Sequence, residues 1–379
     1  MFLNRKLIKN VNWYIPIVTL LLIAIGILSI CSAGELNKES ATGIRLVKKQ
    51  LISVVLGIIL IAIIQFFDYR IFQYYSTIIY IATVAVLGMI LIIGTTAKGR
   101  TGWISLGGFN FQPSELAKVT MILVLAEVID SKREELKYLT GFIKPFLYVL
   151  VPTLLIILQN DLGTSLVMIT IFIGMLFVGG ANVRFMTLIF GGGFSLVVLL
   201  IASHLLFDTP LIFFKKYQLN RLIVFINPGI DPTGIGYNII QSKIALGSGR
   251  LFGKGLFAGT QNQLRFLPEK HTDFIFSVIG EEFGFIGVLI VIILYFILLW
   301  QIINVAREAK DNYGRLLATG IAAMFFFHIL ENIGMTMGLM PITGLPLPFI
   351  SYGGSSMITS LIAIGLVLNV NIRRKKIVF

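Results

Sequence analysis

The chain has 379 residues, of which 56% are hydrophobic and only 13% are charged, and apolar stretches long enough to cross a bilayer recur from end to end. This composition excludes a soluble enzyme and indicates a polytopic membrane protein. The net charge of +13 would suggest nucleic acid as the partner of a soluble domain, but here an anionic membrane surface fits better, and no basic and aromatic nucleic-acid platform is present.

Apolar windows of about 20 residues predict ten membrane-spanning helices and an all-α fold. The predicted spans are 13–33, 48–67, 74–94, 113–130, 144–159, 162–180, 185–207, 274–304, 315–340 and 349–371. The first is longer than the core of a signal peptide and further spans follow it, so we expect it to be retained as a helix. It contains the single cysteine, Cys31, which excludes a disulfide or a cysteine metal site within one chain.

Basic residues predict the orientation of the chain. With a cytoplasmic N-terminus, the inside segments hold sixteen Lys and Arg, whereas the short outside segments hold six, namely Lys38, Arg45, Lys48, Lys49, Lys98 and Arg100. The positive-inside rule therefore places both termini in the cytoplasm. We expect one transmembrane domain over 1–379, with a large extracytoplasmic loop over 208–273. Loops of this length are usually functional.

Polar residues open two of the spans. Glu115 and Lys118 stand three residues apart at the start of the fourth span, where they share a helical face and can pair. This pair either orders the start of the helix or lines a substrate cavity, because charges inside a membrane usually face one. Asp161 opens the sixth span, where the helix dipole favours a carboxylate, and a structural cap explains it as well as a functional role does.

The large loop contains ordered and basic parts. Residues 237–247 are spaced like a short amphipathic helix ended by glycine, which we expect on the membrane surface. Residues 247–255 form a glycine-rich run that carries Arg250 and Lys254 and suits close approach of the backbone to a phosphate. A plain flexible loop is the alternative. Basic residues outnumber acidic ones in 208–273, so an anionic substrate or lipid headgroup would be attracted there.

The stretch 267–276 places a polar cluster directly before a long apolar helix. Asp273 is a lone carboxylate at the mouth of that helix, and it can act as a base if its apolar neighbours raise its pKa. Its structural alternative is the N-cap of the eighth span. His271 is the rival base, and Glu269 belongs to the same cluster.

The last spans carry polar residues and a helix break. His328, Glu331 and Asn332 share a face of span nine, in a structural or a functional role. The run 341–356, which includes Ser351 and Ser355, interrupts helical structure at membrane depth. Such a break is tolerated only against protein or a water-filled cavity, so it predicts a lined site.

Five stretches carry a resemblance to a known family. They are 112–118, 161–164, 236–249, 267–276 and 346–356, and they occur in the order and spacing of the shape, elongation, division and sporulation (SEDS) family. The resemblance covers essentially all ten spans, and the wording of 231–237 favours the elongation branch over the division branch. The chain departs from the family at Asn160, where many members have proline, and around Arg100, whose role stays open.

The resemblance implies a peptidoglycan glycosyltransferase that polymerises lipid II at the outer face of the bacterial cytoplasmic membrane. It would work with a class B penicillin-binding protein, expected on spans eight and nine, and with other elongation proteins. Asp273 matches the family's essential carboxylate. Glu115 and Lys118 match its polar cavity pair, and Asp161 matches the acid of its Asp-Leu-Gly-Thr motif. Further substrate-binding or cavity residues are expected at Glu269, His271, Arg250, Lys254, Ser351 and Ser355.

Extending a glycan on a lipid pyrophosphate asks for a base near the acceptor hydroxyl and for cations near the leaving pyrophosphate. Asp273 is the expected base. The positive charge would come from Lys118, Arg250, Lys254, Arg265 or a divalent cation such as magnesium or manganese, and no other cofactor is expected. Attack from the face opposite the pyrophosphate would invert the α linkage of the donor.

Two other functions remain open. A lipid II flippase or transporter would also use ten spans, intramembrane ions and broken helices. A scaffold that only holds a penicillin-binding protein would depend on apolar faces of spans eight and nine, and it would tolerate the loss of Asp273. The chain contains no soluble transpeptidase domain, so cross-linking would come from a partner.

Overall fold

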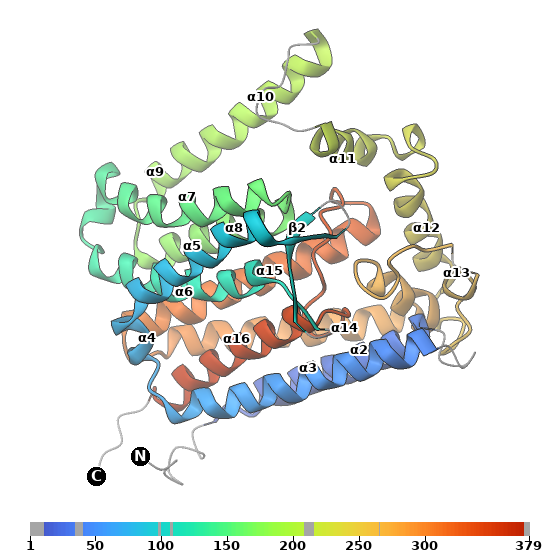
Figure 1. The fold of residues 1–379 in the computed structure, drawn as a ribbon, viewed down its shortest axis with the longest axis horizontal. Coiled ribbons are helices and arrows are strands. Elements are labelled where there is room, and N and C mark those ends of the chain that lie inside the picture. Colours follow the sequence, from blue (N-terminus) through green and yellow to red (C-terminus); the bar gives the residue numbers. More distant parts are fainter. Residues whose placement is uncertain are drawn as a thin grey trace.

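The computed structural model describes residues 11–34, 41–97, 100–106, 109–207, 216–264 and 266–374, which form a bundle of long helices with one small sheet (Figure 1). The long helices are α2 (Tyr14–Ala33), α3 (Ala41–Phe66), α5 (Ser76–Ile93), α6 (Pro113–Ser131), α7 (Ile143–Leu158), α8 (Leu162–Gly179), α10 (Gly192–Phe207), α14 (Ile275–Arg307), α15 (Asn312–Met337) and α16 (Gly354–Ile372). The short helices are α4 (Arg70–Tyr74), α9 (Val183–Met186), α11 (Lys216–Ile226), α12 (Ile235–Ser248) and α13 (Thr260–Gln263).

Each predicted span corresponds to a helix, which makes the chain a multi-pass membrane protein. Within the described ranges, nine helices are long and apolar enough to cross a membrane. The tenth predicted span, 113–130, is α6, whose apolar character is reduced by Glu115, Lys118, Glu127 and Asp130. It nevertheless packs against α5, α8 and α15, and most of its side chains are buried by protein rather than exposed to lipid.

Two spans are interrupted. Gly284 has φ 66° and ψ −163°, a conformation open to glycine alone, and it divides α14 into a short first part and a long second part. Residues 341–353 form no helix, so α16 begins at Gly354 rather than at the predicted residue 349. The predicted break before the last span is therefore confirmed.

The centre of the bundle is formed by α15 and α16. The former packs against α6, α8 and α14, and the latter packs mainly against α3. By contrast, α10 projects away from the bundle (Figure 1), and only 6% of the span Val183–His204 is buried. A π-helical turn at Thr187–Gly191 joins α9 to α10.

A small antiparallel sheet between α5 and α6 is absent from the sequence prediction. Its strands are β1 (Thr95–Ala97), β2 (Arg100–Leu106) and β3 (Phe109–Phe111), in the order β1-β2-β3. The register pairs Thr95 with Trp103 and Ile104 with Phe111. Strands of three residues give too short a pattern to recognise in sequence, so the fold is all-α apart from this sheet.

Both ends of the described chain lie at one end of the bundle. The backbone N–H of Asn12 donates to Oδ1 of Asn371 over 2.8 Å. The predicted even number of crossings would bring the ends together in this way. That this side is the cytoplasm stays a prediction.

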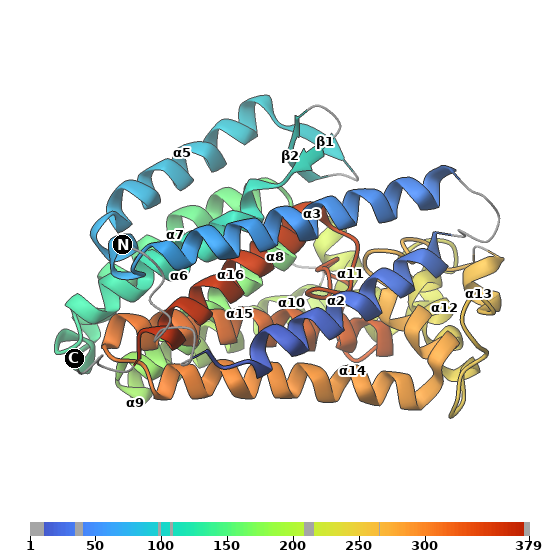
Figure 2. The same cartoon turned by 90° about the horizontal axis from the view of Figure 1, so that it is seen from below.

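The large loop is mostly helical and gathers at the other end of the bundle (Figure 2). Its first residues, 208–215, lie outside the described part of the chain. The predicted amphipathic helix forms as α12 and packs against α14 and α15. Its expected place on the membrane surface stays a prediction. Ser242 on α12 donates to the Thr336 carbonyl over 2.7 Å, and its Oγ lies 2.7 Å from Ser277 Oγ.

Candidate functional site

Asp273 lies in a turn directly before α14, and its side chain is half-buried. Phe274 occupies the N-cap position of α14 and makes no side-chain cap hydrogen bond, so Asp273 stands one residue before the N-cap position that the sequence suggested for it. In the same turn, Thr272 Oγ1 donates to Glu269 Oε2 over 3.2 Å, and Glu269 itself has a positive φ of 51°.

Three consecutive carbonyls of this turn are held by three donors from two other segments. Tyr352 N donates to His271 O over 2.9 Å, and Ser351 Oγ donates to Thr272 O over 2.7 Å. Asn332 Nδ2 donates to Asp273 O over 3.0 Å. The backbone that carries the Asp273 side chain is thus fixed residue by residue, which limits where its carboxylate can lie.

The non-helical segment 341–353 is fixed in turn by α15. Asn332 Nδ2 also donates to Leu345 O over 2.8 Å, and His328 Nδ1 lies 3.2 Å from Pro346 O. Asn332 and His328 stand four residues apart, hence on one face of α15, as predicted. Their neighbour Glu331 accepts a hydrogen bond from Thr343 N over 3.2 Å. Helix α15 therefore holds both the non-helical segment and the Asp273 turn in place.

The predicted pair of Glu115 and Lys118 forms, with Nζ 2.9 Å from Oε1. Their side chains are 5% and 1% exposed, so the pair is removed from solvent. Lys118 Nζ also donates to His328 Nε2 over 2.8 Å, which places the imidazole proton on Nδ1, facing Pro346 O. A continuous polar path thus leads from Glu115 to the same non-helical segment that holds the Asp273 turn.

Asp161 and Ser355 belong to a second group of polar contacts, in which both bind Gln112. Asp161 caps α8, because its Oδ1 accepts from Thr164 N over 3.2 Å, so the predicted cap is confirmed. Its Oδ2 accepts from Gln112 Nε2 over 3.1 Å, and Gln112 N donates to Ser355 Oγ over 3.0 Å. Asn160, just before the cap, has a φ of 62°, which asparagine tolerates and proline cannot adopt.

The glycine-rich run 247–255 packs against the break in α14. Lys254 N and Gly255 N each donate over 3.0 Å, to Glu281 O and Glu282 O. A Cβ on Gly253 would lie 2.1 Å from Glu282 O. The close backbone approach that the glycines predict is real, but the approaching group is the end of a helix segment. The amides of Lys254 and Gly255 are thus occupied by these carbonyls, and contact of the run with a phosphate stays a prediction.

The predicted cations of the loop have different surroundings. Lys254 Nζ lies 2.7 Å from Glu281 Oε1 and 2.7 Å from Thr260 Oγ1, so it is already neutralised. Arg250 is exposed, and Arg265 lies outside the described residues. Within the described ranges no three His, Cys, Asp or Glu side chains gather as a metal site. The divalent cation stays a prediction.

Two further buried carboxylates were not predicted as site residues from the sequence. Glu281 and Glu282 are 0% and 1% exposed. Glu281 accepts from Gln261 N over 2.9 Å, and Glu282 Oε1 accepts from Asn262 Nδ2 over 3.2 Å. Lys270 Nζ in turn donates to Asn262 O over 2.6 Å. The sequence does indicate them, because two consecutive acidic residues inside the apolar eighth span need polar or charged partners.

Comparison with known proteins shows similarity over the whole chain. The family model FtsW/RodA/SpoVE, described as a cell cycle protein, matches residues 12–376. A probable peptidoglycan glycosyltransferase FtsW of Geobacter sp. (strain M18) is 37% identical over 97% of this chain and 98% of its own length. The peptidoglycan glycosyltransferase MrdB of Escherichia coli (strain K12) is 36% identical over 94% of each chain. The peptidoglycan glycosyltransferase RodA of Treponema pallidum is 35% identical over 97% and 99%.

Solved structures agree with these sequence matches. A chain from a peptidoglycan synthase complex, described as coordinating polymerization and crosslinking, superposes with a TM-score of 0.80 at 29% identity, over 96% of this chain and 98% of that chain. The rod shape determining protein RodA of Thermus thermophilus gives 0.70 at 28%, over 97% and 98%. Identity to FtsW and RodA relatives is similar, so the elongation branch stays a prediction. The chain belongs to the FtsW/RodA/SpoVE family, which is the shape, elongation, division and sporulation family.

Proposed function

We propose that this chain is a peptidoglycan glycosyltransferase that joins lipid-linked disaccharide units of lipid II into glycan strands. Its relatives carry that activity in their names. The main structural support is the Asp273 turn. Its carbonyls from His271 to Asp273 accept hydrogen bonds from Tyr352, Ser351 and Asn332. A carboxylate held on such a fixed backbone is suited to one position relative to a substrate.

In this proposal Asp273 acts as the general base. It accepts the proton of the acceptor's sugar hydroxyl while that oxygen attacks the anomeric carbon of the donor. The bond from that carbon to the pyrophosphate breaks, and the lipid pyrophosphate leaves with the electron pair. Attack opposite the leaving group inverts the α linkage to β. His271, whose ring centroid lies 5.7 Å from that of Tyr352, is the rival base in the same turn.

The leaving pyrophosphate needs positive charge rather than a proton. Lys118 and Lys254 are paired with Glu115 and Glu281. Arg250, in the large loop, is the exposed one among the expected cations that the structure describes. We therefore assign it as the cation that meets the leaving pyrophosphate. We propose that the end of the bundle where the large loop gathers (Figure 2) is the extracytoplasmic one, as the basic residues of the sequence predict.

We further propose that a class B penicillin-binding protein contacts α14 and α15, within a complex that holds other elongation proteins. The outward face of α14 carries large exposed apolar side chains, among them Phe285, Phe296 and Trp300. Phe296 and Trp300 stack with ring centroids 6.3 Å apart, giving a flat aromatic surface for a partner helix. Such a partner would supply the cross-linking activity.

The test is polymerisation of lipid II by the purified chain with its penicillin-binding partner, whose own glycosyl transfer is excluded, comparing the native chain with Asp273→Ala. We expect polymer from the native chain only. Polymer from neither chain, with lipid II still moved across liposomes, would favour a flippase. Polymer from both would move the search for the base to His271 and Glu269.

A further inference from the structure

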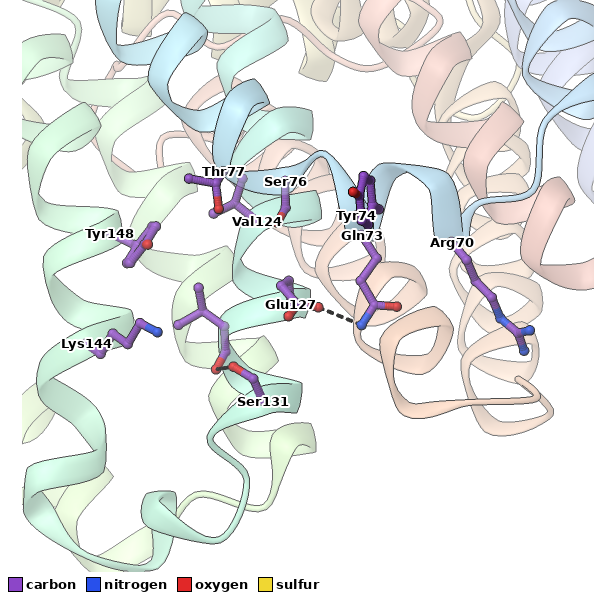
Figure 3. Close-up of a pocket in the computed structure, with 11 residues that line it drawn as sticks. Arg70, Gln73, Tyr74, Ser76, Thr77, Val124, Glu127, Ser131, Lys144 and Tyr148 are labelled. Carbon is purple, nitrogen blue, oxygen red and sulfur yellow. Dashed lines mark hydrogen bonds between the residues drawn. The ribbon is translucent and has the colours of Figure 1, made fainter.

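A second polar site lies at the end of the bundle away from the Asp273 turn, in a cavity of about 500 Å³ (Figure 3). Its walls come from α4, α5, α6 and α7. Arg70, at its edge, pairs with Asp311 beyond the last residue of α14, whereas Asp273 precedes the first. The two sites are thus separated by the whole length of α14, and the glycosyltransferase proposal does not use this cavity.

Besides Arg70, which pairs with Asp311, the cavity is lined by one further cation, Lys144, and by one carboxylate, Glu127, and these two do not pair with each other. Figure 3 shows Lys144 extending from α7 toward α6, where Glu127 meets Gln73 of α4, while Arg70 points away. Glu127 Oε2 accepts a hydrogen bond from Gln73 Nε2 over 2.6 Å. Lys144 is exposed and forms no ion pair with any carboxylate in the described part of the chain. Charges of both signs are therefore available to a ligand.

Hydroxyl groups complete the lining. Ser76 and Thr77 on α5, Ser131 on α6 and Tyr148 on α7 all border the cavity. The ring centroid of Tyr148 lies 4.8 Å from that of Tyr80 on α5. A compact polar group with several hydrogen-bond acceptors fits such a lining.

The outer walls of the cavity face the lipid. On α5, Ile78 and Ile81 are exposed, and on α7, Leu147 and Val151 are exposed. Apolar side chains exposed on membrane-spanning helices meet acyl chains, so a lipid whose headgroup entered the cavity could keep its chains against this surface. A ligand with a polar head and apolar chains matches both parts of the site.

We propose that this cavity binds the headgroup of a phospholipid that carries a phosphate and a primary ammonium group, that is, a phosphoethanolamine headgroup. The phosphate would accept hydrogen bonds from Lys144 and Tyr148, and the ammonium would donate to Glu127. An anionic headgroup without an amine would leave Glu127 beside a negative charge. A quaternary ammonium has no N–H to donate to Glu127, so a choline headgroup would bind less well.

The test is native mass spectrometry of the detergent-purified full chain, supplied with equal amounts of ethanolamine, choline and glycerol phospholipids of the same acyl composition. We expect the chain to retain the ethanolamine lipid at least about tenfold more than the other two, as one charge-assisted hydrogen bond allows. Lys144→Ala and Glu127→Gln should each abolish this preference. Lys137→Ala is the matched control, because Lys137 is an exposed lysine at the same end that pairs with Glu134.

Equal retention of the three lipids, or preference for the glycerol lipid, would overturn the proposal, as would preference unchanged in both variants. Displacement of the lipid by soluble phosphoethanolamine at equal concentration would assign the cavity to a water-soluble ligand instead. Lys144 is exposed, so its replacement leaves the bundle intact and decides the test even if Glu127→Gln fails to fold.

Discussion

The side-chain amide of Asn332 donates to the backbone carbonyl of Asp273 over 3.0 Å, and to that of Leu345 over 2.8 Å. Asn332 is fully buried, and its hydrogen bond to Leu345 is buried while that to Asp273 is partly buried. This one side chain therefore joins the turn that carries the proposed base to the segment that interrupts the last span.

Asn332→Ala should lower the rate of glycan synthesis at least about tenfold, because the proposed base would lose its fixed position. One buried and one partly buried carbonyl would also lose a donor, at a cost of about 2 kcal/mol in unfolding free energy. The measurement is the turnover number and KM for lipid II alongside thermal unfolding. Asn312→Ala, at the start of the same helix, serves as control. A lower melting temperature with unchanged turnover would make Asn332 a purely structural residue.

Glu115→Gln and Lys118→Met should each destabilise the chain by about 3–5 kcal/mol, because each leaves an uncompensated charge in a buried site. The double variant should cost clearly less than the sum of the two, since the residues interact directly. Unfolding free energies in one detergent would provide the cycle. Additive losses would mean that the pair contributes no interaction energy, and that Lys118 is stabilised mainly through His328.

Gly253→Ala should destabilise the chain, whereas Gly247→Ala should be neutral or stabilising. Gly253 has a φ of 80° and approaches Glu282 O, so a methyl group adds strain of about 1–3 kcal/mol before any contact is counted. Gly247 lies within α12 with open space around it, and alanine is favoured there by up to about 1 kcal/mol. Yields of folded protein and melting temperatures test this. Equal effects of the two substitutions would contradict the explanation that Gly253 is needed for its positive φ and for its close approach to Glu282 O.

Stability should fall in acid through Asp311, which lies between α14 and α15. Burial raises the pKa of its carboxyl, but hydrogen bonds from Gly314, Tyr69 and Arg70 outweigh burial and hold the pKa below its usual range. A lowered folded-state pKa stabilises the chain above the unfolded value of about 3.9, and that stability is lost as pH falls. The native chain should therefore exceed Asp311→Asn in melting temperature from pH 5 to 7, with the gap closing below about pH 4. A gap that widens in acid would contradict this account.

Interactions within one helix were open to prediction from the sequence. The spacing of Glu115 and Lys118 brings them together whatever the rest of the fold does, and the apolar windows locate all ten helices. The contact of Asn332 with Asp273 joins residues 59 positions apart, so it depends on how α14 and α15 pack. No local pattern contains that information.

For the glycine-rich run 247–255, the contact partner could not be predicted from the sequence. The run 247–255 correctly indicates that another group approaches its backbone, but sequence does not say which group. In the fold the approaching atoms belong to Glu281 and Glu282 at the break marked by Gly284. The carboxylates themselves were overlooked because the apolar residues around them dominate the span.

The most direct test of the account compares the native chain with Asp273→Asn, assembled with the same penicillin-binding partner in liposomes that contain lipid II. Asparagine keeps the shape and the backbone hydrogen bonds of the turn but cannot accept the proton. We expect normal assembly and lipid II binding, with glycan synthesis reduced at least about a hundredfold, because the general base is lost. Synthesis within a few-fold of the native rate would contradict the assignment of Asp273 as the base.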